Sequence, residues 1–516
     1  GGGEGGRDGA GRGSGASAPP WSTGHLAEPT GPRPPALPLA PQFLQLSSFF
    51  DIKFKRPLSS FGSPDGEVRR GEDGAFEALL QPARSGESHA SNILLLPTGE
   101  LLCAWFNGVE GSGGVAIVVA RLKVGSSKWK KAKIASVMSG RSAQNPVLFL
   151  SHLGGKGASP PWRVNLIHTS QQADQGQGTS QIRFLTSKDG GETWGSKSGK
   201  VLMRGEKGLF VRNHVVALDA DAKELLLPVY YTPKGQSDHK SQYCAMKRSL
   251  DGGSTWHNLG TMTRAGDKYV QASVVALHRD GGPWVPGMPR EKLLLRAWYR
   301  HRNAFRMGFS ESVDGGATWL PARACVLPQN NKAAQAASLP GGGVVIVFNN
   351  VAGRKNQPLS IALSEDGGLT WKHVRDLQRH FDAGGREVEY SYPSVAPAPM
   401  GVGCGGQRST GGDDGDSVHV SYTFSKRGRR RLTIRYLKVF TTLQVFAVDI
   451  AGLPISRSGR RLGGRGTRQG VFLLPAAQDQ DAPGGGHSPR RVSAGVLSLA
   501  LVLPRPPAPL AAALRH

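Results

Sequence analysis

The sequence predicts an all-β protein, a single six-bladed β-propeller with disordered segments at both ends. Two internal repeats lead to this prediction. A turn motif occurs four times at nearly even spacing, and a short apolar strand that opens with polar residues occurs six times. Repeats of about 50–70 residues indicate a repeat architecture, and no long amphipathic helical pattern competes with it.

The turn motif has the form Ser-x-Asp-Gly-Gly-x-Thr-Trp, an Asp box, and its aspartates lie 62, 63 and 52 residues apart. Ser and Asp side chains hydrogen-bond to nearby backbone amides, and glycine adopts positive φ at little cost. We therefore expect each box to be a hairpin turn whose aspartate is structural rather than catalytic. The four aspartates are Asp189, Asp251, Asp314 and Asp366.

The six apolar strands set the number of blades, because successive starts lie 55 to 69 residues apart. Each is expected to be the innermost strand of one blade, so that the polar starts converge at one end of the central channel. Closing the blades into a ring protects the sheet edges. The strands open with Ser88-His89, Gln144-Asn145, Arg212-Asn213, Gln271, Gln335 and Tyr392.

Composition divides the chain into three segments. Residues 1–42 hold 11 Gly and 8 Pro and are expected to be disordered, residues 43–445 form the propeller, and residues 446–516 are a low-complexity basic tail. The formal net charge of +26 favours an anionic partner without naming it.

Several classes of protein are disfavoured. The chain has no run of 18 apolar residues, so no membrane span is expected, and its four cysteines contain no Cys-x-x-Cys pair that would favour zinc. The basic run at residues 426–431 lies between two expected strands, and we interpret it as a solvated turn. No aromatic residues interleave with it, so nucleic acid is not expected as a partner.

Over residues 85–440 the chain resembles the sialidases (neuraminidases), particularly the Asp-box sialidase-like proteins of bacteria and plants. The resemblance rests on the four Asp boxes and on several short phrases. These include Ser88-His89-Ala90-Ser91, Gln144-Asn145-Pro146-Val147-Leu148-Phe149, Tyr390-Ser391-Tyr392-Pro393-Ser394-Val395 and Val418-His419-Val420-Ser421-Tyr422-Thr423.

The resemblance implies a retaining glycoside hydrolase that acts on terminal sialic acid or a similar acidic sugar, without a metal or cofactor. In this family a tyrosine is the nucleophile, because a carboxylate would be repelled by the acidic substrate. Tyr392, on the sixth inner strand, matches the nucleophile. Arg296 and Arg354, which precede the third and fourth boxes, resemble arginines that bind the substrate carboxylate. Arg300, Arg302 and Arg306 follow in an expected loop and are predicted to lie on the surface.

Three expected roles lack their usual residue. His89 stands where the first arginine of the family would open the first inner strand, and Gln271 stands at the position of the glutamate that activates the tyrosine. Gly113-Gly114 occupies the place of the acid aspartate. The nearest carboxylate is Glu110, and Glu387 or Glu389 near Tyr392 are alternatives.

Other polar residues at the strand starts favour a carbohydrate pocket, since sugar hydroxyls suit amide donors and acceptors. Two functions remain open from the sequence: a sialidase-like hydrolase, or a non-catalytic propeller that binds acidic glycans or a protein. The sugar, its linkage, the compartment and the oligomeric state are not predicted. The expected pocket residues of this kind are Gln144, Asn145, Arg212, Asn213, Gln271 and His89.

Overall fold

The computed structural model describes residues 63–70, 75–152, 160–235, 238–303, 305–340, 342–379, 388–398, 417–426 and 433–440. The segments 1–42 and 446–516, residues 427–431 of the basic run, and Glu387 lie outside the described residues. The expectations made for them are therefore not tested here.

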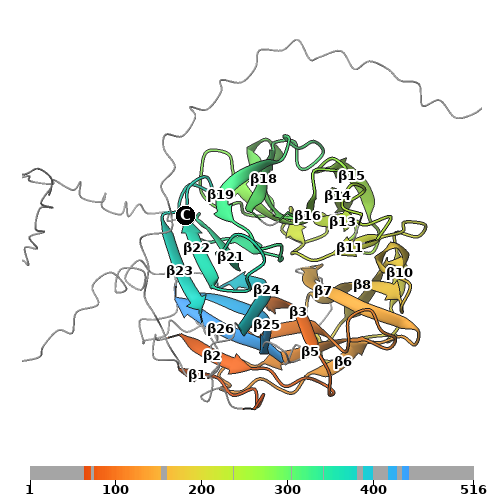
Figure 1. Ribbon diagram of the computed structural model, residues 1–516. Coiled ribbons are helices and arrows are strands. Elements are labelled where there is room, and N and C mark those ends of the chain that lie inside the picture. The colour runs from red at the N-terminus through yellow and green to blue at the C-terminus, as the bar shows by residue number, and fades with distance from the viewer. Residues whose placement is uncertain are drawn as a thin grey trace, which may run out of the picture. The chain divides into compact units, whose positions relative to one another are not determined.

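Six antiparallel sheets are arranged around a central axis (Figure 1), which confirms the predicted six-bladed propeller. The first three blades follow one another along the chain. Blade 1 comprises β3 (Ser88–Leu95), β4 (Leu101–Asn107), β5 (Ala116–Leu122) and β6 (Lys133–Ser136). Blade 2 comprises β7 (Arg141–Ser151), β8 (Arg163–Gln172), β9 (Gln181–Ser187) and β10 (Lys200–Leu202), with the short 3-10 helix η2 (Gln177–Thr179) between β8 and β9. Blade 3 comprises β11 (Leu209–Val211), β12 (Val216–Ala217), β13 (Leu225–Tyr231), β14 (Tyr243–Ser249) and β15 (His257–Thr261).

The remaining blades complete the ring. Blade 4 comprises β16 (Tyr269–His278), β17 (Leu293–His301), β18 (Arg306–Ser312) and β19 (Arg323–Pro328), with the 3-10 helix η3 (Arg290–Lys292) before β17. Blade 5 comprises β20 (Gln335–Ser338), β21 (Val344–Asn349), β22 (Leu359–Ser364) and β23 (His373–Gln378). Blade 6 comprises β24 (Val388–Pro397), β25 (Ser417–Lys426) and β26 (Thr433–Phe440), and it is completed by β2 (Phe76–Leu79) and β1 (Arg69–Arg70).

Blade 6 joins the two ends of the described chain. Strand β2, which precedes blade 1 in sequence, pairs with β26, so Phe76 lies opposite Lys438. Pairing between β2, near the beginning of the described chain, and β26, its last strand, closes the ring. The blades pack face to face through apolar side chains. The cluster that includes Phe106 of β4 and Leu166 of β8, for example, joins blades 1 and 2.

Five of the six predicted inner strands are the innermost strands of their blades. In blade 3 the predicted strand is interrupted, because Arg212 and Asn213 lie between β11 and β12. Four of the six share a local irregularity. Pairing with the second strand shifts register near the start of β3, β7, β16 and β24. At each shift a residue other than glycine has positive φ: Ala90 (56°), Asn145 (48°), Gln271 (54°) and Tyr392 (53°). Such bulges bend a strand and redirect its side chains. Here they lie where the polar starts of the strands approach one another.

The four Asp boxes are turns between the third strand and the outermost strand of blades 2 to 5. In the first box, Ser187 donates to Asp189 (2.6 Å), and Asp189 accepts from the amide of Thr193 (2.9 Å). The same contacts recur at Asp251, Asp314 and Asp366. The predicted structural role of the boxes is thus supported by their geometry.

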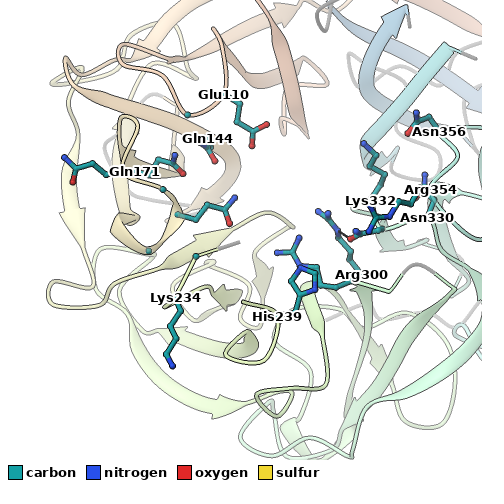
Figure 2. Close-up of a pocket in the computed structure, with 18 residues that line it drawn as sticks. Glu110, Gln144, Gln171, Lys234, His239, Arg300, Asn330, Lys332, Arg354 and Asn356 are labelled. Carbon is teal, nitrogen blue, oxygen red and sulfur yellow. Dashed lines mark hydrogen bonds between the residues drawn. The ribbon is translucent and has the colours of Figure 1, made fainter. Parts of the chain in front are cut away.

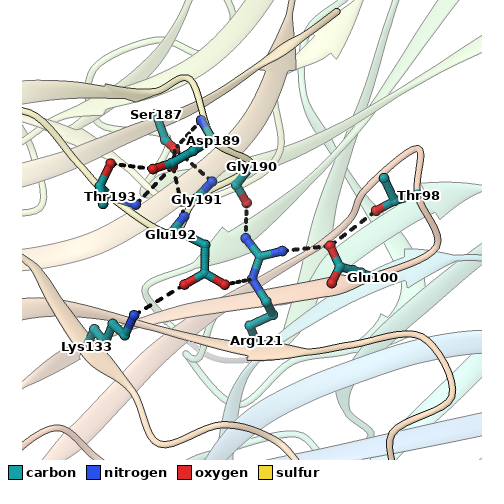
Figure 3. A network of polar contacts seen from close by, with 10 residues as sticks. All are labelled: Thr98, Glu100, Arg121, Lys133, Ser187, Asp189, Gly190, Gly191, Glu192 and Thr193. Atoms are coloured by element: carbon teal, nitrogen blue, oxygen red, sulfur yellow. Dashed lines mark hydrogen bonds and ion pairs between the residues drawn. The ribbon is translucent and has the colours of Figure 1, made fainter. Parts of the chain in front are cut away.

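Arginines of a neighbouring blade hold two of these turns in place. Figure 3 shows Arg121 of β5 donating to the carbonyl of Gly190 in the first box while it pairs with Glu100 (2.7 Å) and Glu192 (3.1 Å). In the same way, Arg296 of β17 donates to the carbonyl of Asp366 in the fourth box. The Asp-box turns therefore also connect adjacent blades.

Candidate functional site

A cavity of about 1150 Å³ opens where the inner strands begin and the second strands end (Figure 2). Its walls come from the first five blades. Blades 1 and 2 contribute Glu110, Gly111, Gln144, Gln171, Gln175, Gly176, Gln177 and Gly178. Blades 3 to 5 and the loops between them contribute Lys234, Gly235, His239, Arg300, Arg302, Asn330, Asn331, Lys332, Arg354 and Asn356.

Positive charge dominates the wall. Among the described residues that line the cavity, five are lysine or arginine and Glu110 is the single carboxylate. Figure 2 shows Glu110 on one side and Arg300, Lys332 and Arg354 across from it. Burial, with a contribution from the nearby arginines, lowers the pKa of His239, so this side chain is neutral near pH 7.

Two of the three arginines of the wall are held by neutral groups. Arg300, only 7% exposed, donates to Asn331 Oδ1 (2.9 Å), Gln271 Oε1 (3.0 Å) and Tyr392 Oη (2.7 Å). Arg302, 5% exposed, donates to Gln242 Oε1 (2.8 Å). Burial lowers its pKa to about 10, which leaves it protonated at neutral pH.

Arg354 lies exposed on the β21–β22 loop, and within the described ranges its side chain has no hydrogen bond or ion pair. None of the three wall arginines is paired with a described carboxylate, whereas Arg121 and Arg435 elsewhere in the propeller pair with glutamates. Their charge is therefore uncompensated, and an anion entering the cavity would meet free guanidinium donors.

Tyr392 lies directly behind Arg300 and remains partly exposed, although it is not itself a lining residue of the cavity. The guanidinium groups of Arg212 and Arg300 lie 5.4 Å and 5.8 Å from the centroid of its ring, and the ring contacts that of His89 (4.3 Å between centroids). Burial raises the pKa of Tyr392, but Arg300, Lys332 and Arg302 together lower it further than burial and Glu110 raise it. The site thus favours the phenolate more than water does.

Residues 99–402, more than half of the chain, match the family model of the BNR repeat-like domain. The chain belongs to this BNR repeat-like family. No curated protein sequence matches it.

The solved structures that resemble this BNR-repeat protein are mostly sialidases. An intramolecular trans-sialidase from Ruminococcus gnavus, in complex with oseltamivir carboxylate, matches with a TM-score of 0.53 and 12% identity, over 75% of this chain and 99% of that one. A protein of unknown function from Dyadobacter fermentans matches with a TM-score of 0.51 and 15% identity, over 72% and 98% of the chains.

A Hadza microbial sialidase matches with a TM-score of 0.51 and 14% identity. The match covers 69% of this chain and 66% of the sialidase. At such identities the likeness concerns the fold. Together with the family match, it supports the resemblance noted in the sequence: this is a sialidase-like BNR-repeat protein.

The structure places Arg296 away from the cavity. Its Nε donates to Glu311 (2.8 Å) and its Nη1 to the carbonyl of Asp366 (2.9 Å), so the guanidinium belongs to the contact between blades 4 and 5. An end of the strand at Arg296 would have placed this side chain at the channel, but β17 continues to His301. Arg296 pairs with Val275 in the middle of the sheet and cannot reach the channel end.

The expectation that Arg300 and Arg302 lie on the surface is wrong for the same reason. Arg300 pairs with Val270 beside the start of β16, which brings it to the cavity. The antiparallel register of the β16–β17 hairpin was the signal that could have located it, because the end of a second strand lies beside the start of the first. Arg306, as expected, is exposed.

Most other expected pocket residues connect the inner strands instead of lining the cavity. Buried Arg212 donates to the carbonyls of Ser91 (3.0 Å) and Pro393 (2.9 Å) across the channel. Asn213 donates to the carbonyls of Gln271 (2.9 Å) and Ala272 (3.0 Å). These contacts tie blade 3 to blades 1, 4 and 6, and they satisfy backbone groups exposed by the bulges.

The remaining expected residues divide between the channel and the cavity. His89, 2% exposed, shares a hydrogen bond of 2.9 Å with Thr423, and Asn145 occupies the bulge of β7. Gln144 and Glu110 line the cavity. Glu389 does not: it pairs with Lys332 (3.0 Å) and accepts from Ser391 (2.8 Å), so it orients a lysine of the wall.

The described residues contain no cluster of three or more His, Cys, Asp or Glu that could hold a metal ion. In the same part of the chain no helix has the length and apolar character needed to cross a membrane.

Proposed function

We propose that this protein is a glycoside hydrolase that removes a terminal acidic sugar, such as sialic acid, with Tyr392 as the nucleophile. The observation that carries the proposal is the hydrogen bond from Arg300 to Tyr392, made at the wall of a cavity whose arginines lack anionic partners. It joins a carboxylate-binding group to a candidate nucleophile.

Arg302 and Arg354 supply the recognition of the acid. A guanidinium binds a carboxylate through paired, charge-assisted hydrogen bonds, each worth about 1.5–3 kcal/mol. Arg300 is less available to a ligand, because its Nη1 already donates to Tyr392 and Gln271. A ligand carboxylate that binds Arg300 competes for these donors and would expose the Tyr392 hydroxyl to the sugar.

Tyr392 suits an acidic substrate because its neutral phenol is not repelled by the sugar carboxylate. Within the described ranges its hydroxyl has no carboxylate as a hydrogen-bond partner, and Gln271 occupies the neighbouring position. The phenolate must therefore form by loss of the proton to solvent, which the lowered pKa favours. Arg300 thus takes over the activating role that a glutamate would play.

Glu110, the carboxylate across the cavity, supplies the acid. In the first step Tyr392 Oη bonds to the anomeric carbon, the glycosidic C–O bond breaks, and Glu110 protonates the leaving oxygen. In the second step water attacks the anomeric carbon and gives its proton to Glu110, while Tyr392 departs as the phenolate. The configuration at the anomeric carbon is retained.

One observation favours a second function, a non-catalytic propeller that binds acidic glycans. Gln271 cannot take a proton from Tyr392, and it is bonded to Arg300 as part of a neutral network. The test is turnover of 4-methylumbelliferyl sialoside together with calorimetric binding, in wild type, Tyr392→Phe and Glu110→Gln. Turnover that both substitutions abolish without loss of binding supports the hydrolase. Binding by a wild type that never turns over selects the binding propeller.

A further inference from the structure

The outer edge of blade 1 carries a row of lysines. Residues 123–133 contain no aspartate or glutamate. The lysine row consists of four exposed side chains of this segment: Lys128, Lys130, Lys131 and Lys133. The two residues that interrupt the row, Trp129 and Ala132, are only 1% and 5% exposed. A short surface segment of this composition is typical of sites that bind polyanions.

The backbone beneath the lysine row is fixed on both sides. The amide of Trp129 donates to the carbonyl of Gly66 (2.8 Å). The amide of Lys130 donates to the carbonyl of Arg121 in β5 (2.8 Å). The ring of Trp129 also packs edge-on against Tyr436 of blade 6, with 5.1 Å between the ring centroids. A ligand therefore meets lysines that are already aligned, and binding orders only their side chains.

The two ends of the lysine row already bind carboxylates. Lys128 pairs with Glu67, two residues before β1 of blade 6 (3.5 Å). Lys133 pairs with Glu192 in the first Asp box of blade 2 (3.2 Å; Figure 3). Burial would raise the pKa of Glu192, but its bond to Lys133 and the surrounding charges, Lys130 included, lower it below its ordinary value. The row thus spans the outer edge of blade 1 between its two neighbours.

Positive charge is in excess along the row. Within the described part of the chain, the side chains of Lys130 and Lys131 have no hydrogen bond or ion pair. The carboxylates at the two ends are each shared with an arginine as well. Glu67 also pairs with Arg69 (3.0 Å), and Glu192 also pairs with Arg121 (3.1 Å). Anionic groups of a ligand would therefore find lysines without partners in the middle of the row.

An extended polyanion fits this row better than a single anion does. One exposed ion pair contributes little by itself, because water and salt screen it. Stable binding therefore needs several anionic groups that act together. The five residue steps from Lys128 to Lys133 span at most about 18 Å, a length along which successive charged groups of a polymer can contact successive lysines.

The surroundings of the row favour a polysaccharide over nucleic acid or a membrane. Sites for single-stranded nucleic acid add aromatic rings on which bases stack, whereas the aromatic residue of this segment, Trp129, is buried. Membrane-binding surfaces add several apolar side chains that enter the bilayer. Among residues 123–133 the one exposed large apolar side chain is Val124.

We propose that the lysine row binds a linear sulfated polysaccharide, at a site separate from the cavity. None of its four lysines lines the cavity. Sulfate groups remain ionised at every pH at which the protein folds, and lysine binds them as a compact point charge. The inference does not depend on the proposed hydrolysis, so either can fail without the other.

The test uses the double variant Lys130→Gln/Lys131→Gln in the full chain. Its matched control is Lys207→Gln/Lys223→Gln, which removes the same charge from two exposed positions, one in blade 3 and one in the loop that leads into it. Neither control residue lines the cavity. Equal loss of charge matters because the whole chain carries +26, which by itself attracts polyanions.

The probes are a heparin oligosaccharide, the same oligosaccharide with its sulfates removed, a short DNA duplex, and vesicles of phosphatidylcholine and phosphatidylserine in equal parts. The measurement is the calorimetric Kd at about 0.15 M NaCl. We expect wild type to bind heparin more tightly than the other three probes. Lys130→Gln/Lys131→Gln should weaken heparin binding about fivefold to thirtyfold, and the control should weaken it less than twofold.

Four results would overturn the inference. They are absence of heparin binding by wild type, no loss in Lys130→Gln/Lys131→Gln, an equal loss in the control, and binding of the desulfated chain, the DNA or the vesicles as tight as that of heparin. Arg354→Ala shows whether the oligosaccharide enters the cavity instead. A loss of heparin affinity in Arg354→Ala as large as that in the lysine variant would also contradict a separate site.

Discussion

Arg300 donates a hydrogen bond of 2.7 Å to the hydroxyl of Tyr392, and this contact joins blade 4 to blade 6 at the end of the central channel. The two residues are separated by 92 positions in the chain, and the bulge at Tyr392 brings them together. Asn331 holds the other side of the same guanidinium. The charge that would bind an anion therefore also acts on the candidate nucleophile.

The pKa of Tyr392 should depend on Arg300. Because Arg300 is the largest of the charges that lower this pKa, its replacement in Arg300→Gln should raise the pKa towards and above the ordinary value of about 10. The measurement is an ultraviolet difference titration of each protein against its Tyr392→Phe counterpart. If turnover occurs, kcat/KM should rise with pH through the same pKa. If the pKa of Tyr392 is unchanged in Arg300→Gln, Arg300 does not activate Tyr392.

Arg354 should select acidic ligands. Arg354→Ala removes charge-assisted bonds worth about 1.5–3 kcal/mol, so affinity for a sialic acid glycoside should fall roughly tenfold to a hundredfold. A neutral sugar should lose much less. Arg306→Ala is the matched control, since Arg306 is exposed and does not line the cavity. Calorimetry with both sugars decides, and an equal loss for acidic and neutral ligands would contradict a carboxylate site at Arg354.

Arg296 should matter for stability and not for binding. Arg296→Met leaves Glu311 without its partner at a site where the two side chains are 10% and 15% exposed, and it frees the carbonyl of Asp366. Loss of one partner of such a pair should lower the free energy of unfolding by about 2–3 kcal/mol. Urea denaturation measures the loss, and the double variant Arg296→Met/Glu311→Gln should recover part of it. If the folded Arg296→Met variant binds an acidic sugar more weakly than wild type does, Arg296 takes part in binding and this prediction is wrong.

The sequence alone was sufficient to predict those features of the fold that repeat. The Asp boxes and the polar starts of the inner strands recur at a fixed period, so both the six blades and the turns could be predicted without a structure. The position of Arg300 was missed because it depends on where β17 ends, and only with that end known does the hairpin register place Arg300 beside the start of β16. Its burial is decided by Gln271, Asn331 and Tyr392, which come from three different parts of the chain.

Gln171, on the side of the cavity formed by blade 2, shows the same limit of prediction from sequence. The loop that follows it is rich in amides, but the sequence does not show that the side-chain Oε1 of Gln171 is buried without a hydrogen-bond partner among the described residues, while Gln172 is exposed. Alternation along β8 separates the two residues, and the fold decides which face meets the cavity.

The Asp boxes should make the propeller sensitive to acid. Burial alone would raise the pKa of each box aspartate, but hydrogen bonds from the Ser and Thr hydroxyls and from backbone amides lower it below the ordinary value, to about 2 for Asp189. A carboxylate whose pKa is lower in the folded state stabilises the fold above the unfolded pKa of about 4. That contribution is lost as the pH falls through the folded value.

Asp314→Asn should therefore destabilise the protein at pH 7 by about 1 kcal/mol, a value kept small because Asp314 is exposed to solvent. As the pH falls below about 4, where wild type loses the contribution of the carboxylate, the stability of the variant should fall less steeply, so the two proteins converge. The matched control is Asp174→Asn, at an exposed aspartate outside the four boxes. Thermal unfolding at a series of pH values measures both effects. A constant difference between Asp314→Asn and wild type down to pH 2 would show that the loss comes from the turn geometry and not from the charge of Asp314.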